Sequence, residues 1–215
     1  IGALLPLALL LALICMLSCG PAERPLAPRS QTWAELRAVR GEVTVAGPGE
    51  SKRALYPRER LVDGAEIEVP QDGLAWLRRD GGATLLVRGP GKLTLRQDAL
   101  LVDQGRIFID SPGDTVTAIE TKQGMLHLVR VRASLDVAAQ GTTEAYVLSG
   151  EVRTDRGGQA EAGQRLTLKG TGTAVQAVTA PMVAWEDWTG GLATTDRSAS
   201  PPPFGVGTAD RKSVV

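Results

Sequence analysis

Histidine and cysteine are nearly missing from this chain. Its 215 residues contain one histidine, His127, and two cysteines, Cys15 and Cys19. A structural zinc site needs about four ligands, most of them His or Cys, and a Ser-His-Asp triad needs a histidine held beside its nucleophile. We therefore expect a non-enzymatic protein that has no metal site and no cofactor.

The chain also lacks net charge and has few aromatic residues. The 24 Lys and Arg residues balance the 24 Asp and Glu residues, so no excess of positive charge favours nucleic acid as a partner. Aromatic residues make up 4% of the chain, which is few for a surface that stacks on sugar rings. What is present is 43% hydrophobic residues, 25 glycines and 13 prolines, a composition typical of a folded domain with many turns.

The first segment is apolar and uncharged. Residues 3–17 read ALLPLALLLALICML, and the first charged residue is Glu23. This run is shorter than the roughly 20 residues of a spanning helix but fits the apolar part of a signal peptide. It ends in Ser18-Cys19-Gly20, which resembles the bacterial lipobox and implies a signal peptide over 1–18 with a lipid on Cys19. An ordinary secretory signal or a short membrane anchor is the alternative.

After a proline-containing tether over 19–32, the pattern is that of short strands. Val39, Val43 and Val45 alternate with polar residues, so a strand over 38–46 is favoured over the helix that Thr32 and Glu35 would cap. Similar stretches predict strands at 65–69, 74–77, 83–88, 92–96, 100–103, 106–109, 115–121, 126–131, 135–138, 143–148, 151–154 and 165–168.

Glycine-containing turn signals separate these stretches and define the expected fold class. They include Asp63-Gly64, Gly89-Pro90-Gly91, Gln104-Gly105 and Ser149-Gly150. We expect an all-β domain over 33–180, built as a short solenoid, a sandwich or a barrel. The similar sequences of 104–109 and 149–154 favour the solenoid.

Several of these stretches together resemble the FecR domain, over about residues 36–170. The stretches are Ala38–Val45, Leu61–Ala65, Asp80–Leu85, Val102–Ile107 and Val147–Val152 with Ala162–Gln164. The resemblance implies a β-rich, solenoid-like domain in the bacterial cell envelope. Founding members of that family pass a signal from an outer-membrane receptor to a cytoplasmic sigma factor.

The composition changes again near Ala180. Residues 181–209 contain three consecutive prolines at 201–203 and predict a linker to a further C-terminal domain. Trp185 to Gly191 and Pro203 to Gly207 are similar to the linker of myxobacterial envelope proteins in which a FecR domain precedes a VIT domain. We expect Trp185 and Trp188 to contact either the β domain or a partner, and favour the β domain. Residues 210–215 look like a translated sequencing adapter and are left out of the fold.

The densest basic cluster is the main candidate contact surface. Arg58 and Arg60 lie near Lys52, Arg53 and Tyr56 in the sequence. Arginines beside an aromatic residue can bind anionic partners, whereas the balancing acids favour a solvated, salt-bridged loop. Exposed strand edges and the loops at 57–60 and 89–91 are further candidate contacts, because an edge can accept a partner's strand.

Three other patterns have simpler interpretations. Gly89-Pro90-Gly91-Lys92 lacks the remaining residues of a phosphate-binding loop and predicts a turn. His127 has no second histidine and no neighbouring acid in sequence. An acid pair suited to glycoside hydrolysis is conceivable, but outward strand positions account for most of the candidates, Glu66, Glu68, Asp103, Asp110 and Asp114.

The function expected from the sequence is that of an interaction module. We expect a lipoprotein on the periplasmic face of the cell envelope, in the outer membrane by analogy, anchored by Cys19. Its β domain would bind another envelope protein or its own C-terminal domain. One alternative is a FecR-type transmembrane regulator of an extracytoplasmic sigma factor, and a less favoured one is a protein that binds cell-wall glycans.

Overall fold

The computed structural model describes residues 32–79, 81–113 and 117–177, and within them every regular element is a β-strand. This confirms the all-β fold class. The expected signal peptide, the tether up to residue 31, the linker, Cys19, Trp185, Trp188 and Asp114 lie outside the described residues. Among the described residues, no helix has the length and apolar character needed to cross a membrane.

Within the described ranges, fourteen strands form one sheet in which nearly all neighbours are antiparallel. In chain order they are β1 (Thr32–Arg40), β2 (Thr44–Ala46), β3 (Arg53–Ala54), β4 (Arg60–Val62), β5 (Glu66–Val69), β6 (Leu74–Arg79), β7 (Thr84–Leu95), β8 (Ala99–Asp110), β9 (Thr117–Thr121), β10 (Gly124–Ala138), β11 (Thr142–Thr154), β12 (Gln159–Glu161), β13 (Gln164–Lys169) and β14 (Gly172–Ala177).

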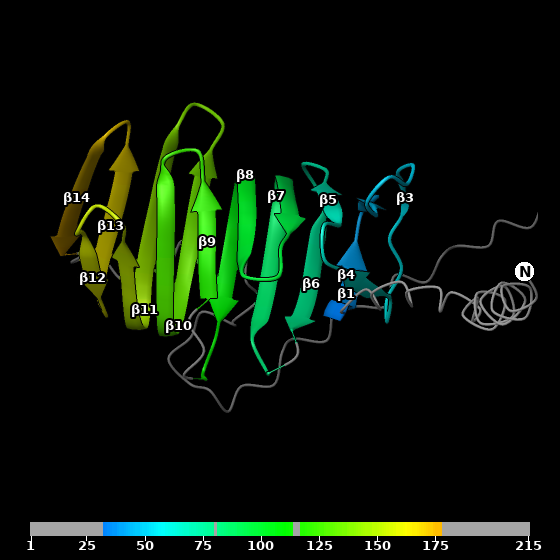
Figure 1. The fold of residues 1–215 in the computed structure, drawn as a ribbon, viewed down its shortest axis with the longest axis horizontal. Helices are drawn as coiled ribbons and strands as arrows, with labels where there is room; N and C mark the ends of the chain where they lie inside the picture. The colour runs from blue at the N-terminus through cyan, green and yellow to red at the C-terminus, as the bar shows by residue number, and fades with distance from the viewer. Residues whose placement is uncertain (1–31, 80, 114–116, 178–215) are drawn as a thin grey trace, which may run out of the picture. The chain divides into compact units, whose positions relative to one another are not determined.

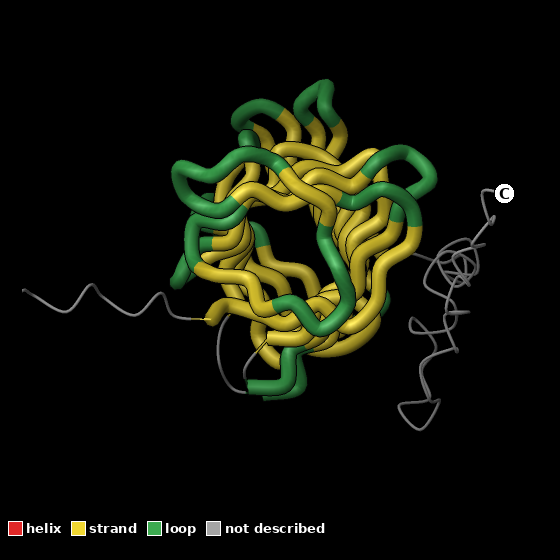
Figure 2. The backbone as a smooth tube through the Cα atoms, turned by 90° about the vertical axis from the view of Figure 1, so that its right-hand side faces the viewer, coloured by secondary structure: helices red, strands yellow, loops and turns green. Residues whose placement is uncertain are grey.

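The sheet of the β domain is rolled around its long axis. The strands lie side by side along this axis (Figure 1), and seen end on they surround it (Figure 2). The main path of hydrogen-bonded neighbours runs from β14 through β13, β11, β10, β9, β8, β7, β5 and β2 to β3. Among the described strands, only β8 and β9 pair in parallel, where Ala99 to Val102 lie beside Ala118 to Thr121. The described strands therefore form one rolled, mostly antiparallel sheet rather than two stacked sheets.

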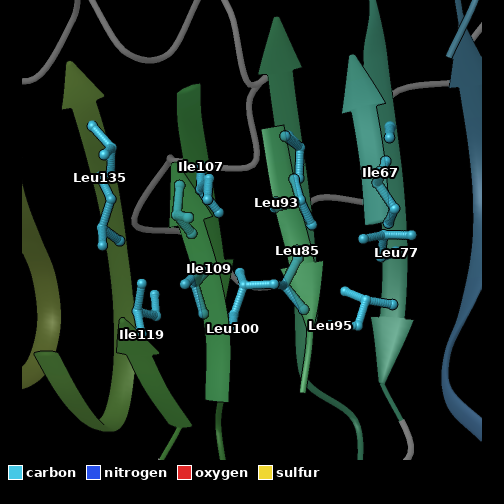
Figure 3. Close-up of a cluster of buried hydrophobic side chains, with 14 of the residues drawn as sticks. Ile67, Leu77, Leu85, Leu93, Leu95, Leu100, Ile107, Ile109, Ile119 and Leu135 are labelled. Carbon is cyan, nitrogen blue, oxygen red and sulfur yellow. The ribbon is translucent and has the colours of Figure 1, made fainter. Parts of the chain in front are cut away.

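The inner face of the rolled sheet holds the hydrophobic core. Alternate residues of each strand point inward, and aliphatic side chains such as Leu85, Leu100 and Ile107 are 0% exposed (Figure 3). Val, Ile and Leu at these positions are residue types that pack well on a pleated surface. Burial of each such side chain stabilises the fold by about 1.5 to 3 kcal/mol.

The long strands bend at glycines where the sequence predicts chain reversals. The predicted strands 83–88 and 92–96 are one strand, β7, and its pairing with β8 shifts register between Arg88 and Lys92. The Gly89–Pro90 peptide bond within it is cis. On the neighbouring strand, Gly105 has a φ of 128°, a conformation in which glycine is favoured because it has no Cβ. Such bulges turn a strand through a corner without ending it.

Three more pairs of predicted strands are corrected in the same way. The expected strands 100–103 and 106–109 join in β8, 126–131 and 135–138 join in β10, and 143–148 and 151–154 join in β11. The single strand expected over 38–46 is instead divided between β1 and β2 at Gly41, whose φ is 77°. Strands β3, β4, β12 and β14 are too short or too polar to show the expected alternation.

Candidate interaction site

The predicted basic cluster lies on the loop between β3 and β4. Its tight turn is closed by the Glu59 amide, which donates to the Tyr56 carbonyl oxygen over 3.2 Å, and Arg58 has a φ of 69°. The Arg58 amide donates to the Leu36 carbonyl oxygen over 2.7 Å, which ties the turn to β1. Arg58 and Arg60 are exposed, and the Tyr56 side chain is 65% exposed.

Some basic residues of this cluster form ion pairs with acidic residues, and others do not. Arg53 pairs with Glu59, and Lys52 Nζ lies 2.6 Å from Glu68 Oε1. Neither Arg58 nor Arg60 forms an ion pair with another described residue. The expected salt-bridged loop is thus present for half of the cluster, and two exposed arginines near Tyr56 have no ion-pair partner in the part of the chain that the structure describes.

The Arg53–Glu59 pair also shifts the ionisation of both groups. Burial by itself would raise the pKa of Glu59, but the hydrogen bond from Arg53 and the Tyr56 amide outweigh it, so this pKa lies below its ordinary value. The hydrogen bond to Glu59 raises the pKa of Arg53. Glu59 therefore stays charged and fixes the loop that carries Arg58.

A second candidate contact is strand β14, at the other end of the sheet. Within the described part of the chain, β14 pairs only with β13, through a register from Gln164↔Ala177 to Lys169↔Gly172. Its sequence, GTAVQA, contains no charge and no proline, and five of its six residues are exposed. Val175 lies opposite the buried Leu166 yet is 39% exposed, because it is at the end of the core.

Such an edge is unusual in a soluble domain. Natural edge strands are commonly protected by lysine, proline or a bulge, since unprotected ones accept strands from other chains. β14 has none of these features along its length. The sequence did not predict this strand, because four of its six residues are Gly, Ala or Thr and its alternation is weak.

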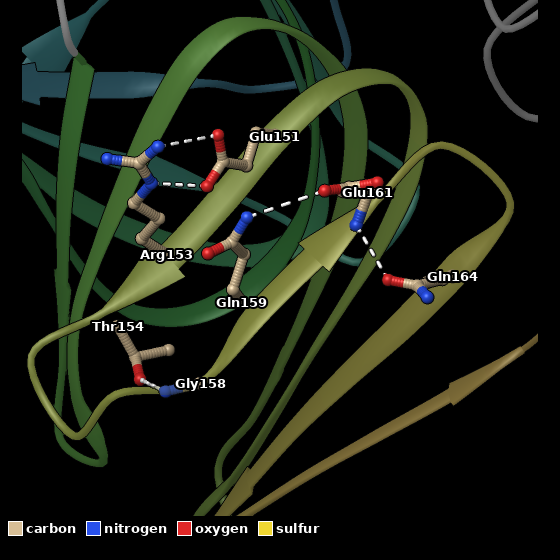
Figure 4. Close-up of polar contacts among 7 residues, drawn as sticks. All are labelled: Glu151, Arg153, Thr154, Gly158, Gln159, Glu161 and Gln164. Atoms are coloured by element: carbon tan, nitrogen blue, oxygen red, sulfur yellow. Dashed lines mark hydrogen bonds and ion pairs between the residues drawn. The ribbon is translucent and has the colours of Figure 1, made fainter.

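His127 has an acidic neighbour that its sequence surroundings did not reveal. Its Nε2 atom lies 2.7 Å from Asp155 Oδ1, and both side chains are well exposed. Asp155 sits in the turn between β11 and β12, where the Gly158 amide donates to Thr154 Oγ1 over 3.0 Å (Figure 4). The same figure shows the surface pair Glu151 and Arg153, in which the hydrogen bond from Arg153 lowers the pKa of Glu151. The His127–Asp155 contact is a surface ion pair when His127 is protonated.

The glycine-rich segment at 89–92 is part of β7 rather than a phosphate loop. The Gly89 amide donates to the Gly73 carbonyl oxygen over 3.1 Å and so is not directed at a ligand. A Cβ at Gly89 would lie 1.6 Å from the Pro70 carbonyl oxygen, which explains why glycine is needed there. Gly89 and Pro90 line an open groove of about 470 Å³ that also contains Arg106, whose Nε lies 3.0 Å from Asp136 Oδ2.

Two of the candidate carboxylates, Glu68 and Asp110, lie beside basic side chains. Glu68 lies beside Lys52 and Lys92, whereas Asp110 pairs with Arg132 at 3.4 Å. Among the described residues, no group of three His, Cys, Asp or Glu side chains could hold a metal ion.

Comparisons with known proteins give a limited similarity. No protein-family model and no curated protein sequence matches this chain. Two crystal structures of a "putative anti-sigma factor" from Parabacteroides distasonis ATCC 8503 are similar, each with a TM-score of 0.48, at 14% and 13% sequence identity. Each alignment covers 56% of this chain and 63% of that protein, which is less than two thirds of its length.

Proposed function

We propose that this chain is a non-enzymatic lipoprotein of the bacterial cell envelope whose β domain binds a strand of another envelope protein at β14. The observation that carries this proposal is the exposed, uncharged edge of β14, which pairs only with β13 among the described residues. A partner's strand would extend the sheet by main-chain hydrogen bonds.

The chemistry of this edge favours a protein over a glycan or a nucleic acid. Strand addition uses the backbone N–H and C=O groups of β14, and Val175 offers an apolar side chain beside them. The loop with Tyr56, Arg58 and Arg60 supplies a second contact surface of residue types that are enriched at protein interfaces. A binding function of this kind needs no catalytic group.

The location in the envelope and the regulatory role rest on sequence patterns. The apolar run that ends at Cys19 supports a lipid anchor, and the FecR resemblance over about 36–170 supports a module that transmits a signal by binding proteins. The same resemblance supports a second candidate function, that of a transmembrane regulator of an extracytoplasmic sigma factor. The two differ in whether Cys19 carries the membrane attachment.

Site-specific photo-crosslinking in the native cells tests the edge. A photoreactive residue at Ala177, the exposed end of β14, should give one adduct of discrete mass with another protein. Ala174→Lys, which places a charge on the edge, should abolish the adduct, whereas Ala174→Thr, an uncharged strand former, should preserve it. The same photoreactive residue at the exposed Gln97, in the turn between β7 and β8, serves as the negative control.

The outcome separates the parts of the proposal. An adduct that persists with Ala174→Lys, or no adduct at Ala177, would show that the edge is not the binding site. Independently, Cys19→Ala should move the protein from the membrane fraction to the soluble fraction. If the variant stays in the membrane, the lipid anchor is wrong and the transmembrane regulator is favoured.

A further inference from the structure

The outer face of the rolled sheet carries an unexpected apolar row. Residues in register across successive strands, on the side away from the core, are Trp76 on β6, Leu86 on β7, Phe108 on β8, Ser134 on β10 and Tyr146 on β11. Leu74, Leu86 and Phe108 form a hydrophobic cluster separate from the main core, with Trp76 and Leu148 packed against it. An outward face of a soluble sheet is normally polar.

This row is covered, although no described strand is layered over it. Leu86 is 0% exposed, Phe108 is 1% exposed and Ser134 is 0% exposed. The described strands all belong to a single sheet, so none of them forms a second sheet over the outer face. Beside the row, the Arg132 side chain is 7% exposed, with its guanidinium 6.0 Å from the centre of the Phe108 ring. Arginine side chains are almost never this inaccessible unless they are paired, and Asp110 is the ion-pair partner of Arg132.

The same row continues in register across β13 to the C-terminal end of β14. Tyr146 is in register with Arg165 on β13, and Arg165 is in register with Gln176 on β14. The Arg165 guanidinium lies 5.7 Å from the centre of the Tyr146 ring and donates to Gln176 Oε1 over 2.6 Å. Strand β14 therefore ends at Ala177, adjacent to one end of the row, and a further 38 residues follow in the sequence.

The apolar residues that follow Ala177 in the sequence are far enough along the chain to reach the row. From β14 the path crosses β13, β11 and β10 to β8, which at about 4.8 Å per strand is roughly 19 Å, and β7 lies at roughly 24 Å. Trp185 follows Ala177 by eight residues, or up to about 26 Å when extended, and Trp188 reaches up to about 36 Å. The intervening residues include Met182 and Val183.

We propose that the chain after Ala177 runs back along this outer row and that Trp185 and Trp188 cover Phe108, Leu86 and Trp76. The two indoles supply the large apolar area that the cluster needs for burial. This contact uses side chains on the outer face, whereas strand addition at β14 uses backbone groups at its edge. The inference therefore stands independently of the proposed function.

Chemical accessibility of a thiol placed in the row tests the proposal in the full chain. With Cys15 and Cys19 replaced by serine, Ser134→Cys introduces a single thiol at a position that is 0% exposed. We expect slow alkylation of this thiol in the folded protein. Trp185→Ala combined with Trp188→Ala should accelerate alkylation at least tenfold, and the two Trp→Phe replacements should keep it slow.

Two controls keep the result interpretable. A thiol at the exposed Gln97 should react rapidly and equally in all backgrounds, which checks that the alanine variants do not unfold the domain. If Ser134→Cys itself lowers the melting temperature, Leu148→Cys at the border of the same cluster replaces it.

The alkylation experiment gives different results if something other than Trp185 and Trp188 covers the row. If the two alanine replacements leave the alkylation rate unchanged, the proposal is overturned. If the thiol becomes accessible on dilution while the tryptophans have no effect, a second copy of the chain covers the row, and the proposal is equally overturned.

Discussion

Gly150→Ala should destabilise the β domain far more than an alanine at a glycine of similar backbone conformation elsewhere. Gly150 lies at the corner of β11, has a φ of 78°, and faces the backbone of β10. An added Cβ would lie 2.2 Å from the Arg130 carbonyl oxygen and 2.7 Å from the Val129 carbonyl oxygen. Atoms cannot approach this closely, so β10 and β11 would have to separate at the corner.

Gly157 provides the matched control. Its φ is 82°, and an added Cβ would meet nothing within 4 Å. Gly157→Ala therefore measures only the free-energy cost of placing a residue with a Cβ in the left-handed backbone conformation. This cost is about 1 to 2 kcal/mol. Gly150→Ala adds the steric displacement, which for an overpacked site costs a further 1 to 3 kcal/mol or so. We expect a total loss of about 2 to 5 kcal/mol in the free energy of unfolding for Gly150→Ala.

Thermal and urea unfolding of the two variants measure this difference. At about 2 to 4 °C per kcal/mol for a chain of this size, the melting temperature should fall by about 2 to 8 °C for Gly157→Ala and by about 4 to 20 °C for Gly150→Ala, with Gly150→Ala always the lower. Equal destabilisation of the two variants would refute the close approach of β10 and β11 as the reason for glycine at this corner.

Two further predictions concern the basic loop and the core. Because the pKa of Glu59 is lowered in the folded protein, its pair with Arg53 stabilises the fold at pH values above the ordinary Glu pKa of 4.5. This stabilisation is lost as the pH falls through the lower pKa of the folded state. Glu59→Gln should thus reduce the urea midpoint at pH 7 but not at pH 2.5, and an equal reduction at both pH values would contradict the assignment. Leu100→Ala, at a fully buried position, should cost about 2 to 5 kcal/mol, measured by urea unfolding, whereas a loss below about 1 kcal/mol would mean that the rolled core is looser than described.

The positions of most strands could be predicted, whereas their continuity could not. Alternation of aliphatic and polar residues marks 65–69 correctly, because inward and outward positions differ in polarity there. The glycines at 105 and 150 indicate a change of chain direction. The sequence alone does not show whether this change is a hairpin turn or a bulge within one strand. Which one forms depends on whether the neighbouring strand continues past the glycine, and this is a property of the assembled sheet.

The candidate sites likewise include some that the sequence predicted and some that it did not. Arg58 and Arg60 were predicted from their clustering, and the structure shows which of their neighbours are neutralised. The contact between His127 and Asp155 could not be predicted, because 28 residues separate the two in sequence. The edge of β14 was missed because small residues carry little strand signal.

The sequence by itself determined the all-β class, because local alternation and glycine frequency reflect the strand backbone directly. Only the tertiary structure decided that the sheet rolls around one axis and that Trp76, Leu86 and Phe108 share an outer row. Register between strands joins residues that are far apart along the chain. A pattern read along one strand contains no information on its partners.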